Sequence, residues 1–165
     1  MQSYLQAQWR RFFGLNVSPV DQLLFVGGQF RPEQWPHLYA MDIRAVLSLQ
    51  AEHEDQFIDP LPTRTLRLLV EDHTAPTLAQ LAEAVDFMTV AHNEGLPVFV
   101  HCHAGVGRAP TTAAAYVAVR QGLTAEAAMA RIAKARPIIT PNPAQMRRLH
   151  EFVAAYAPPI SAPNQ

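Results

Sequence analysis

Four short apolar runs recur along this chain of 165 residues, and each is bounded by turn-forming residues. Runs of this length, rich in Val, Leu and Phe, are typical of buried β-strands. Stretches with helical periodicity separate them, and strands that alternate with helices favour a parallel sheet covered on both faces. The sequence therefore predicts a single α/β domain with a central, mostly parallel sheet of four to five strands flanked by helices. The predicted strands span residues 23–28, 45–49, 65–70 and 97–102.

The helical stretches carry their own start and stop signals. The longest lies before the fourth strand, has apolar side chains three or four residues apart from Leu78 to Met88, and ends at Gly95. Thr124 is the expected N-cap of a later helix, because its hydroxyl can accept a hydrogen bond from a backbone N–H of the first turn. The predicted helices span residues 32–41, 77–95, 109–121, 125–135 and 143–156.

Length and composition fit one globular domain. Hydrophobic residues make up 49% of the chain and charged residues 16%, which is an ordinary balance for a folded protein. We predict one domain over residues 1–157, with residues 1–16 as an N-terminal helical extension and residues 158–165 as a disordered tail. The extension is amphipathic, and we interpret it as a helix that docks on the domain rather than as a peripheral membrane contact.

Several classes of partner and compartment are disfavoured. Thirteen basic and fourteen acidic residues leave a formal charge of -1, which does not indicate a nucleic-acid surface. No apolar run approaches the ~20 residues of a membrane-spanning helix, and the N-terminus lacks the apolar core of a secretory signal. One cysteine cannot form an intramolecular disulfide. The expectation is a cytoplasmic monomer.

The single cysteine, Cys102, follows the most apolar run and opens a segment that we call the cysteine loop (residues 102–108). Gly105 and Gly107 allow backbone angles that turn successive N–H groups inward as an anion nest. The following helix adds the positive end of its dipole, and Arg108 adds a planar donor for two phosphate oxygens. The loop is therefore a candidate cradle for a tetrahedral dianion. Its expected lining is His103, Ala104, Gly105, Val106, Gly107 and Arg108.

This environment predicts a reactive Cys102. Thiols near cations and helix N-termini ionise at lower pH than free thiols, and a thiolate beneath a phosphate can attack phosphorus to give a phosphocysteine. One carboxyl group can protonate the leaving group and later activate water. The segment VEDHTAPT, the acid loop (residues 70–77), follows the third predicted strand and supplies that carboxyl. Glu71 and Asp72 point oppositely in an extended segment, and we choose Asp72.

The sequence HCHAGVGRA resembles the signature of cysteine-dependent protein tyrosine phosphatases, and VEDHTAP is similar to the general-acid loop of their compact, bacterial-like dual-specificity members. RPIITPNPAQ, the late loop (residues 136–145), and the opening LLFVGGQ are also similar to segments of this family. The resemblance covers about residues 17–155. It implies a phosphatase without a cofactor or metal that acts on a phosphorylated protein or a small phosphate ester.

By this resemblance, Cys102 is the nucleophile, Arg108 the phosphate clamp, Asp72 the acid and base, and His101 a support for the loop and the thiolate. The same resemblance implies that Gln145 places the hydrolytic water. The alternative is that Gln145 is an exposed helix residue without this role. The family usually has Ser or Thr after the arginine, whereas this chain has Ala109, as in the phosphatases of regenerating liver. This departure affects the expected rate of phosphoenzyme hydrolysis.

Other interpretations remain. A lone cysteine is usually structural, and His73, His101, Cys102 and His103 are all metal-ligand types, although zinc spacing is absent. A catalytically dead phosphate-binding module and a rhodanese-like transferase are two further interpretations, and the presence of Asp72 disfavours both.

The substrates that the resemblance implies are phosphotyrosine and phosphoserine or phosphothreonine in proteins. Phosphoinositides, inositol phosphates and phospholipids rank second, because the cysteine loop has no lysine.

Overall fold

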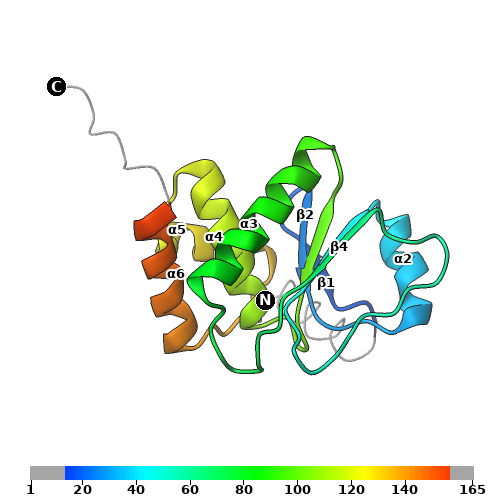
Figure 1. Ribbon diagram of the computed structural model, residues 1–165, viewed down its shortest axis with the longest axis horizontal. Coiled ribbons are helices and arrows are strands. Elements are labelled where there is room, and N and C mark those ends of the chain that lie inside the picture. Colours follow the sequence, from blue (N-terminus) through cyan, green and yellow to red (C-terminus); the bar gives the residue numbers. More distant parts are fainter. Residues whose placement is uncertain (1–13, 157–165) are drawn as a thin grey trace.

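The computed structural model describes residues 14–156, which form one five-stranded sheet with helices on both faces (Figure 1). The strand order is β1-β2-β5-β3-β4, and all neighbours are parallel except β1 and β2. The strands are β1 (Val17–Pro19), β2 (Leu24–Gly27), β3 (Ala45–Ser48), β4 (Arg64–Arg67) and β5 (Val98–His101). The helices are η1 (Pro32–Gln34), α2 (Trp35–Ala40), α3 (Leu78–Asn93), α4 (Arg108–Gln121), α5 (Ala125–Ala135) and α6 (Pro143–Tyr156). The predicted fold class is confirmed.

Two details of the predicted sheet are wrong. Strand β1, which pairs antiparallel with β2 at one edge, was not predicted. The third predicted strand was expected to be buried over residues 65–70, yet β4 ends at Arg67 and is mostly exposed. It is the other edge strand, so only one side has a neighbour to pair with. Leu68 and Val70 are buried, but they reach the core from an irregular segment that follows the strand.

Local signals set the helix ends. The Thr77 side chain accepts from the backbone N–H of Gln80, and the Gln80 side chain accepts from the backbone N–H of Thr77, which makes a capping box at the start of α3. The Thr124 hydroxyl accepts from the Ala127 N–H at 3.1 Å, so the predicted N-cap of α5 is confirmed. Gly95 and Gly122 have positive φ just after α3 and α4, where a left-handed residue commonly ends a helix.

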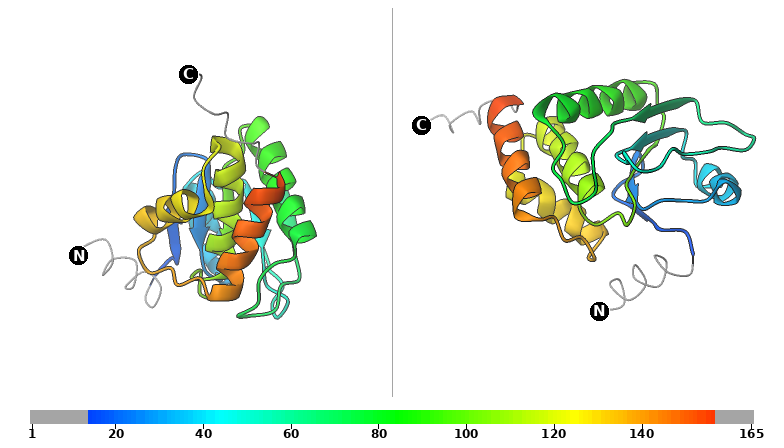
Figure 2. Two further views of the ribbon diagram at one scale, coloured as in Figure 1. Left: turned by 90° about the vertical axis from the view of Figure 1, so that its left-hand side faces the viewer. Right: turned by 60° about the horizontal axis from the view of Figure 1, so that its bottom comes forward.

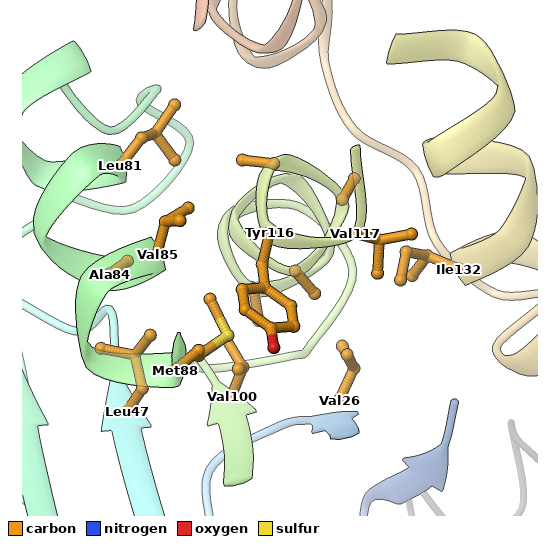
Figure 3. Packing of buried hydrophobic residues seen from close by; sticks show 14 of the residues in the cluster. Val26, Leu47, Leu81, Ala84, Val85, Met88, Val100, Tyr116, Val117 and Ile132 are labelled. Carbon is orange, nitrogen blue, oxygen red and sulfur yellow. The ribbon is translucent and has the colours of Figure 1, made fainter. Parts of the chain in front are cut away.

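Helix α4 lies between α3 and α5 in the thicker helical layer, and α6 packs against it as well (Figures 2 and 3). Val26, Leu47 and Val100 project from three neighbouring strands toward this layer, where Tyr116 and Val117 of α4 meet them (Figure 3). All five side chains are at most 3% exposed. This core holds α4 and β5 rigidly on either side of the cysteine loop, which connects them.

The opposite face of the sheet carries a smaller core beneath η1 and α2. Trp35 is fully buried there, and its indole N–H donates to the Pro60 carbonyl at 2.6 Å. Phe30 and Phe99 pack close to it. This core places the segment after β3, which bears several acidic residues, along the same sheet edge as the cysteine loop.

Acidification is expected to destabilise the fold through His92 on α3. Its Nε2 lies 2.6 Å from the Leu23 carbonyl, and its Nδ1 faces the Tyr116 hydroxyl. Burial lowers the pKa of His92 below its usual 6.5, so the folded state favours the neutral ring. The stabilisation is complete above pH 6.5 and is lost as the pH falls through the lowered value. One group contributes at most about 1.4 kcal/mol per pH unit.

Urea unfolding at pH 7 and pH 5 measures this contribution. The free energy of unfolding should fall more steeply with acidification in the parent than in His92→Gln, which has no ring to protonate. Equal pH dependence in the two proteins would contradict the assignment.

The predicted N-terminal helical extension and the predicted tail lie outside the described residues, except for residues 14–16, which are not helical. Between residues 14 and 156, no helix has the length and apolar character needed to cross a bilayer.

Candidate active site

The cysteine loop turns sharply between β5 and α4. Gly105 has φ +70°, and a Cβ there would lie 2.4 Å from the backbone of Gly27. A Cβ on Gly107 would lie 2.9 Å from the side-chain amide of Gln145. Gly105 is therefore required by its backbone angle and by its close approach to Gly27, whereas a side chain at Gly107 would displace the Gln145 amide.

Arg136 holds the cysteine loop from behind. Its Nε donates to the Gly105 carbonyl at 2.6 Å, and its Nη2 donates to the Ala104 carbonyl at 3.1 Å. It also donates to the Ser18 hydroxyl of the edge strand β1 and to Oδ1 of Asn16, the residue before that strand. Arg136 is 1% exposed. Since the loop carbonyls are bound on this side, the backbone N–H groups are favoured to face the opposite side, as an anion nest requires.

A cavity of about 280 Å³ lies on that opposite side. Cys102, a free thiol that is 3% exposed, is among its lining residues. The acid loop and the late loop supply the remaining wall. The complete lining is Asp72, His73, Cys102, His103, Ala104, Val106, Gly107, Arg108, Thr140, Asn142 and Gln145. The structure therefore brings most of the predicted site together. Gly105 is not in the lining, and His101 is buried behind it.

Arg108 is almost fully buried and fixed by oxygen acceptors. Its Nη1 donates to the Val70 carbonyl at 2.8 Å and to Glu52 Oε2 at 2.8 Å, and its Nη2 donates to Glu52 Oε1 at 2.7 Å. The hydrogen bond to Arg108 lowers the pKa of Glu52 to about 2. Burial alone would lower the pKa of Arg108, but the Glu52 hydrogen bond and the negative charges of Cys102, Glu52 and Asp72 raise it overall. The clamp is a permanent cation.

Asp72 faces the cavity from the acid loop. Its Oδ1 lies 3.0 Å from Arg108 Nη2, and its side chain is half exposed, so a carboxyl and the clamp meet at one point of the wall. Glu71 is exposed, and its carbonyl accepts hydrogen bonds from Thr74. Of the two adjacent carboxyl groups, the structure directs Asp72 to the site.

Three side chains from Asn142 and the first half of α6 hold the acid loop in this position. Asn142 Nδ2 donates to the His73 carbonyl at 2.7 Å, and Gln145 Nε2 donates to the Thr74 carbonyl at 3.1 Å. Arg148 donates to the Pro76 carbonyl. Gln145 is 2% exposed, so its interpretation as an exposed helix residue is wrong. Its side chain borders the cavity and contacts both the acid loop and the cysteine loop.

The two histidines around Cys102 occupy different environments. His101 is fully buried, with Nε2 at 2.6 Å from Asp55 Oδ2 and Nδ1 at 3.4 Å from the Cys102 carbonyl. His103 is exposed at the cavity rim, with Nδ1 at 3.2 Å from Gln29 Oε1. Within residues 14–156, no three His, Cys, Asp or Glu residues are grouped so that they could hold a metal ion.

Three important residues were not found from the sequence: Glu52, Asp55 and Arg136. Glu52 and Asp55 belong to AEHEDQ, an irregular segment without a motif, and their partners lie 56 and 46 residues away. Arg136 begins the late loop, but its sequence does not reveal that it binds loop carbonyls. Only the density of carboxylates after β3 could have directed attention to this segment.

The chain is similar in sequence to a known protein family and to several characterised proteins. The dual specificity phosphatase catalytic domain family matches residues 24–155. Dual specificity protein phosphatase 5 from Rattus norvegicus is 29% identical over 149 residues, covering 88% of this chain and 38% of that protein. Phosphatidylglycerophosphatase and protein-tyrosine phosphatase 1 from the same species is 34% identical over 119 residues, covering 67% and 62%. The chain thus spans about two fifths to three fifths of the length of these relatives.

Solved structures agree with these matches. PTPMT1 in complex with PI(5)P superposes with a TM-score of 0.76 at 27% identity, covering 86% of this chain and 96% of that one. Tk-PTP in its active form has a TM-score of 0.76 at 23% identity, covering 85% and 97%, and shows the fold alone. The family match includes the cysteine loop, the acid loop and the late loop. On this ground the chain belongs to the dual specificity phosphatase catalytic domain family.

Proposed function

We propose that the protein hydrolyses phosphotyrosine and phosphoserine or phosphothreonine in proteins through a phosphocysteine intermediate. The observation that carries this proposal is that Cys102, Arg108 and Asp72 line one cavity, with the Arg108 and Asp72 side chains 3.0 Å apart. A nucleophile, a clamp for the phosphate and a proton donor for the leaving group then act at one phosphorus atom.

In the first step, the Cys102 thiolate attacks phosphorus, the bond between phosphorus and the ester oxygen breaks, and Asp72 protonates the departing oxygen. Arg108 and the loop N–H groups hold the phosphate oxygens. A bound phosphate dianion competes for the positive charge of Arg108 and disfavours a second negative charge nearby. The first step requires Asp72 in its protonated form.

In the second step, Asp72 accepts a proton from water, the water oxygen attacks phosphorus, and the bond between sulfur and phosphorus breaks. Gln145 lies on the cavity wall and is held by the acid loop, which supports a role in placing this water. Gln145 also joins the acid loop to α6, and this contact supports a second role for Gln145, that of positioning Asp72.

Ala109→Ser is expected to raise kcat by up to about tenfold while kcat/KM changes little. A hydroxyl after Arg108 would stabilise the departing thiolate in the second step. The hydroxyls of Thr111 and Thr112 donate to the Gly107 and Arg108 carbonyls of their own helix, so they are poorly placed to substitute for it. Rapid-mixing kinetics with an aryl phosphate should show a burst of aryl product in the parent.

Ala113→Ser is the matched control, since Ala113 is equally buried on α4 but one turn further from Cys102. If the parent shows no burst of aryl product and Ala109→Ser has no higher kcat, hydrolysis of the phosphocysteine does not limit turnover and the prediction is wrong.

The cavity wall supports a broad choice of leaving group. Its described lining contains no Phe, Tyr or Trp that could enclose a phosphotyrosine ring. Selection by an aromatic slot is therefore not expected, and alkyl and aryl phosphates should both enter.

A second candidate is hydrolysis of phospholipid or phosphoinositide monoesters. It is favoured by the 34% identity to a protein named as a phosphatidylglycerophosphatase and by the superposition on PTPMT1 in complex with PI(5)P. The test is kcat/KM on phosphotyrosine and phosphoserine peptides, inositol phosphates and phosphatidylglycerophosphate in mixed micelles. The proposal expects the peptides to be preferred. A clear preference for the lipid would replace it with the second candidate.

A further inference from the structure

We propose that Asp55 is a positioning residue of the catalytic centre, which keeps His101 protonated on both ring nitrogens directly beneath the Cys102 peptide. The inference rests on the proposed function, because it concerns the same nucleophile. Asp55 does not line the catalytic cavity and touches no substrate, so it would act only through His101.

The contact between these residues is short and shielded. His101 Nε2 lies 2.6 Å from Asp55 Oδ2, with side-chain exposures of 0% for His101 and 7% for Asp55. The imidazole is stacked on Phe99 at 5.3 Å and meets the edge of Phe30 at 5.3 Å. The ring cannot rotate to a different partner without disturbing the smaller core.

Both ring nitrogens face acceptors. Nε2 faces a carboxylate, and Nδ1 faces the Cys102 carbonyl oxygen at 3.4 Å. Neither the carbonyl oxygen nor an ionised carboxylate carries a hydrogen that it could donate. A neutral imidazole has one N–H, so one nitrogen would present its lone pair to a lone pair of oxygen. An imidazolium satisfies both contacts, and the Asp55 carboxylate is the anion that balances it.

Other charged groups near His101 and Asp55 do not replace Asp55 as the anion that balances the imidazolium. Glu54 and Arg67 line a cavity of about 90 Å³ together with Asp55, but they pair with each other at 3.7 Å. The Glu54 side chain is 79% exposed, so solvent screens it. Cys102, which is adjacent in sequence to His101, is the other ionisable group at this point. Asp55 Oδ1 is buried without a hydrogen-bond partner among the described residues.

A buried carboxylate with one unsatisfied oxygen costs stability, and proteins tend to retain such groups where function requires them. The resulting imidazolium lies next to the nucleophile in the chain and polarises the Cys102 peptide. A fixed positive charge behind the thiolate favours its ionised form in the same way as the helix dipole does. The Arg108 clamp acts from the cavity side and the His101–Asp55 pair from the core side.

The test combines two measurements that do not depend on phosphatase turnover. The first is ¹⁵N NMR of the full chain labelled on histidine, with His101 assigned by the His101→Asn variant. At neutral pH both His101 nitrogens should carry a hydrogen, and the Nε2 hydrogen should resonate far downfield. The second is the pH dependence of Cys102 alkylation by neutral iodoacetamide.

Asp55→Asn keeps the shape and the acceptor but removes the charge. Its alkylation curve should move to higher pH, with the rate near pH 6 reduced about tenfold. Glu54→Gln is the matched control and should follow the parent. In the His101→Asn background, Asp55→Asn should have little further effect, because the two residues act as a unit.

The proposal is overturned if one ring nitrogen of His101 lacks a hydrogen in the parent, a result that needs no Asp55 variant. It is also overturned if folded Asp55→Asn is alkylated with the parent's pH profile. A parent that hydrolyses no phosphate ester would refute the proposed function and would leave both of these measurements interpretable.

Discussion

Cys102→Ser is expected to reduce turnover of every phosphate ester by at least about 10⁴-fold. A serine hydroxyl stays protonated where a thiol ionises, so the variant has no competent nucleophile for phosphorus. The side chain is buried at the base of the cavity, and oxygen replaces sulfur there without added volume. Steady-state assays with an aryl phosphate measure the loss.

The same variant should keep the phosphate cradle. Arg108 is held by Glu52 and the Val70 carbonyl, and Arg136 holds carbonyls of the cysteine loop. None of these contacts depends on the thiol. Inorganic phosphate should therefore still bind, as measured by calorimetry, and the melting temperature should change little. Residual hydrolysis near the parent rate would remove the covalent mechanism.

Asp72→Asn should reduce kcat/KM in proportion to how much the leaving group needs a proton. The expected loss is about 10²–10⁴-fold for alkyl phosphates and much smaller for aryl phosphates with acidic phenols. An asparagine at this position can still face Arg108, but it cannot transfer a proton to the leaving oxygen. A series of aryl and alkyl phosphates gives the dependence directly.

Glu71→Gln is the matched control for this series, because Glu71 is adjacent and exposed, and its carboxyl does not line the cavity. It should behave as the parent does on all substrates. Equal losses for Asp72→Asn on good and poor leaving groups would show that another group is the acid.

Local patterns were enough to predict the α/β class and most helices. Periodicity and caps are properties of short segments, which is why the limits of α5 and α6 agree with the predicted ranges. The edge strands were harder. β1 has three residues and ends at Pro19, so its pairing with β2 depends on contacts that no local pattern records. β4 was predicted too long because Leu68 and Val70 are buried without belonging to a strand.

The cavity-facing groups could likewise be predicted, since Cys102, Arg108 and Asp72 follow strand ends that meet at one sheet edge. The groups behind them could not. Glu52 and Asp55 act through pairs with residues far along the chain, and their positions follow from how the segment after β3 packs over the smaller core. Long-range ion pairs of this kind are tertiary information.

The central claim is that phosphate passes through Cys102. The most direct measurement is rapid chemical quench of Asp72→Asn with an aryl phosphate that has a good leaving group, followed by mass spectrometry of the peptide containing Cys102. In this variant the first step proceeds and the second lacks its base, so phosphocysteine should accumulate toward one phosphoryl group per chain, with an equal burst of aryl product. Turnover with no phosphoryl group on Cys102 at any quench time would contradict the account.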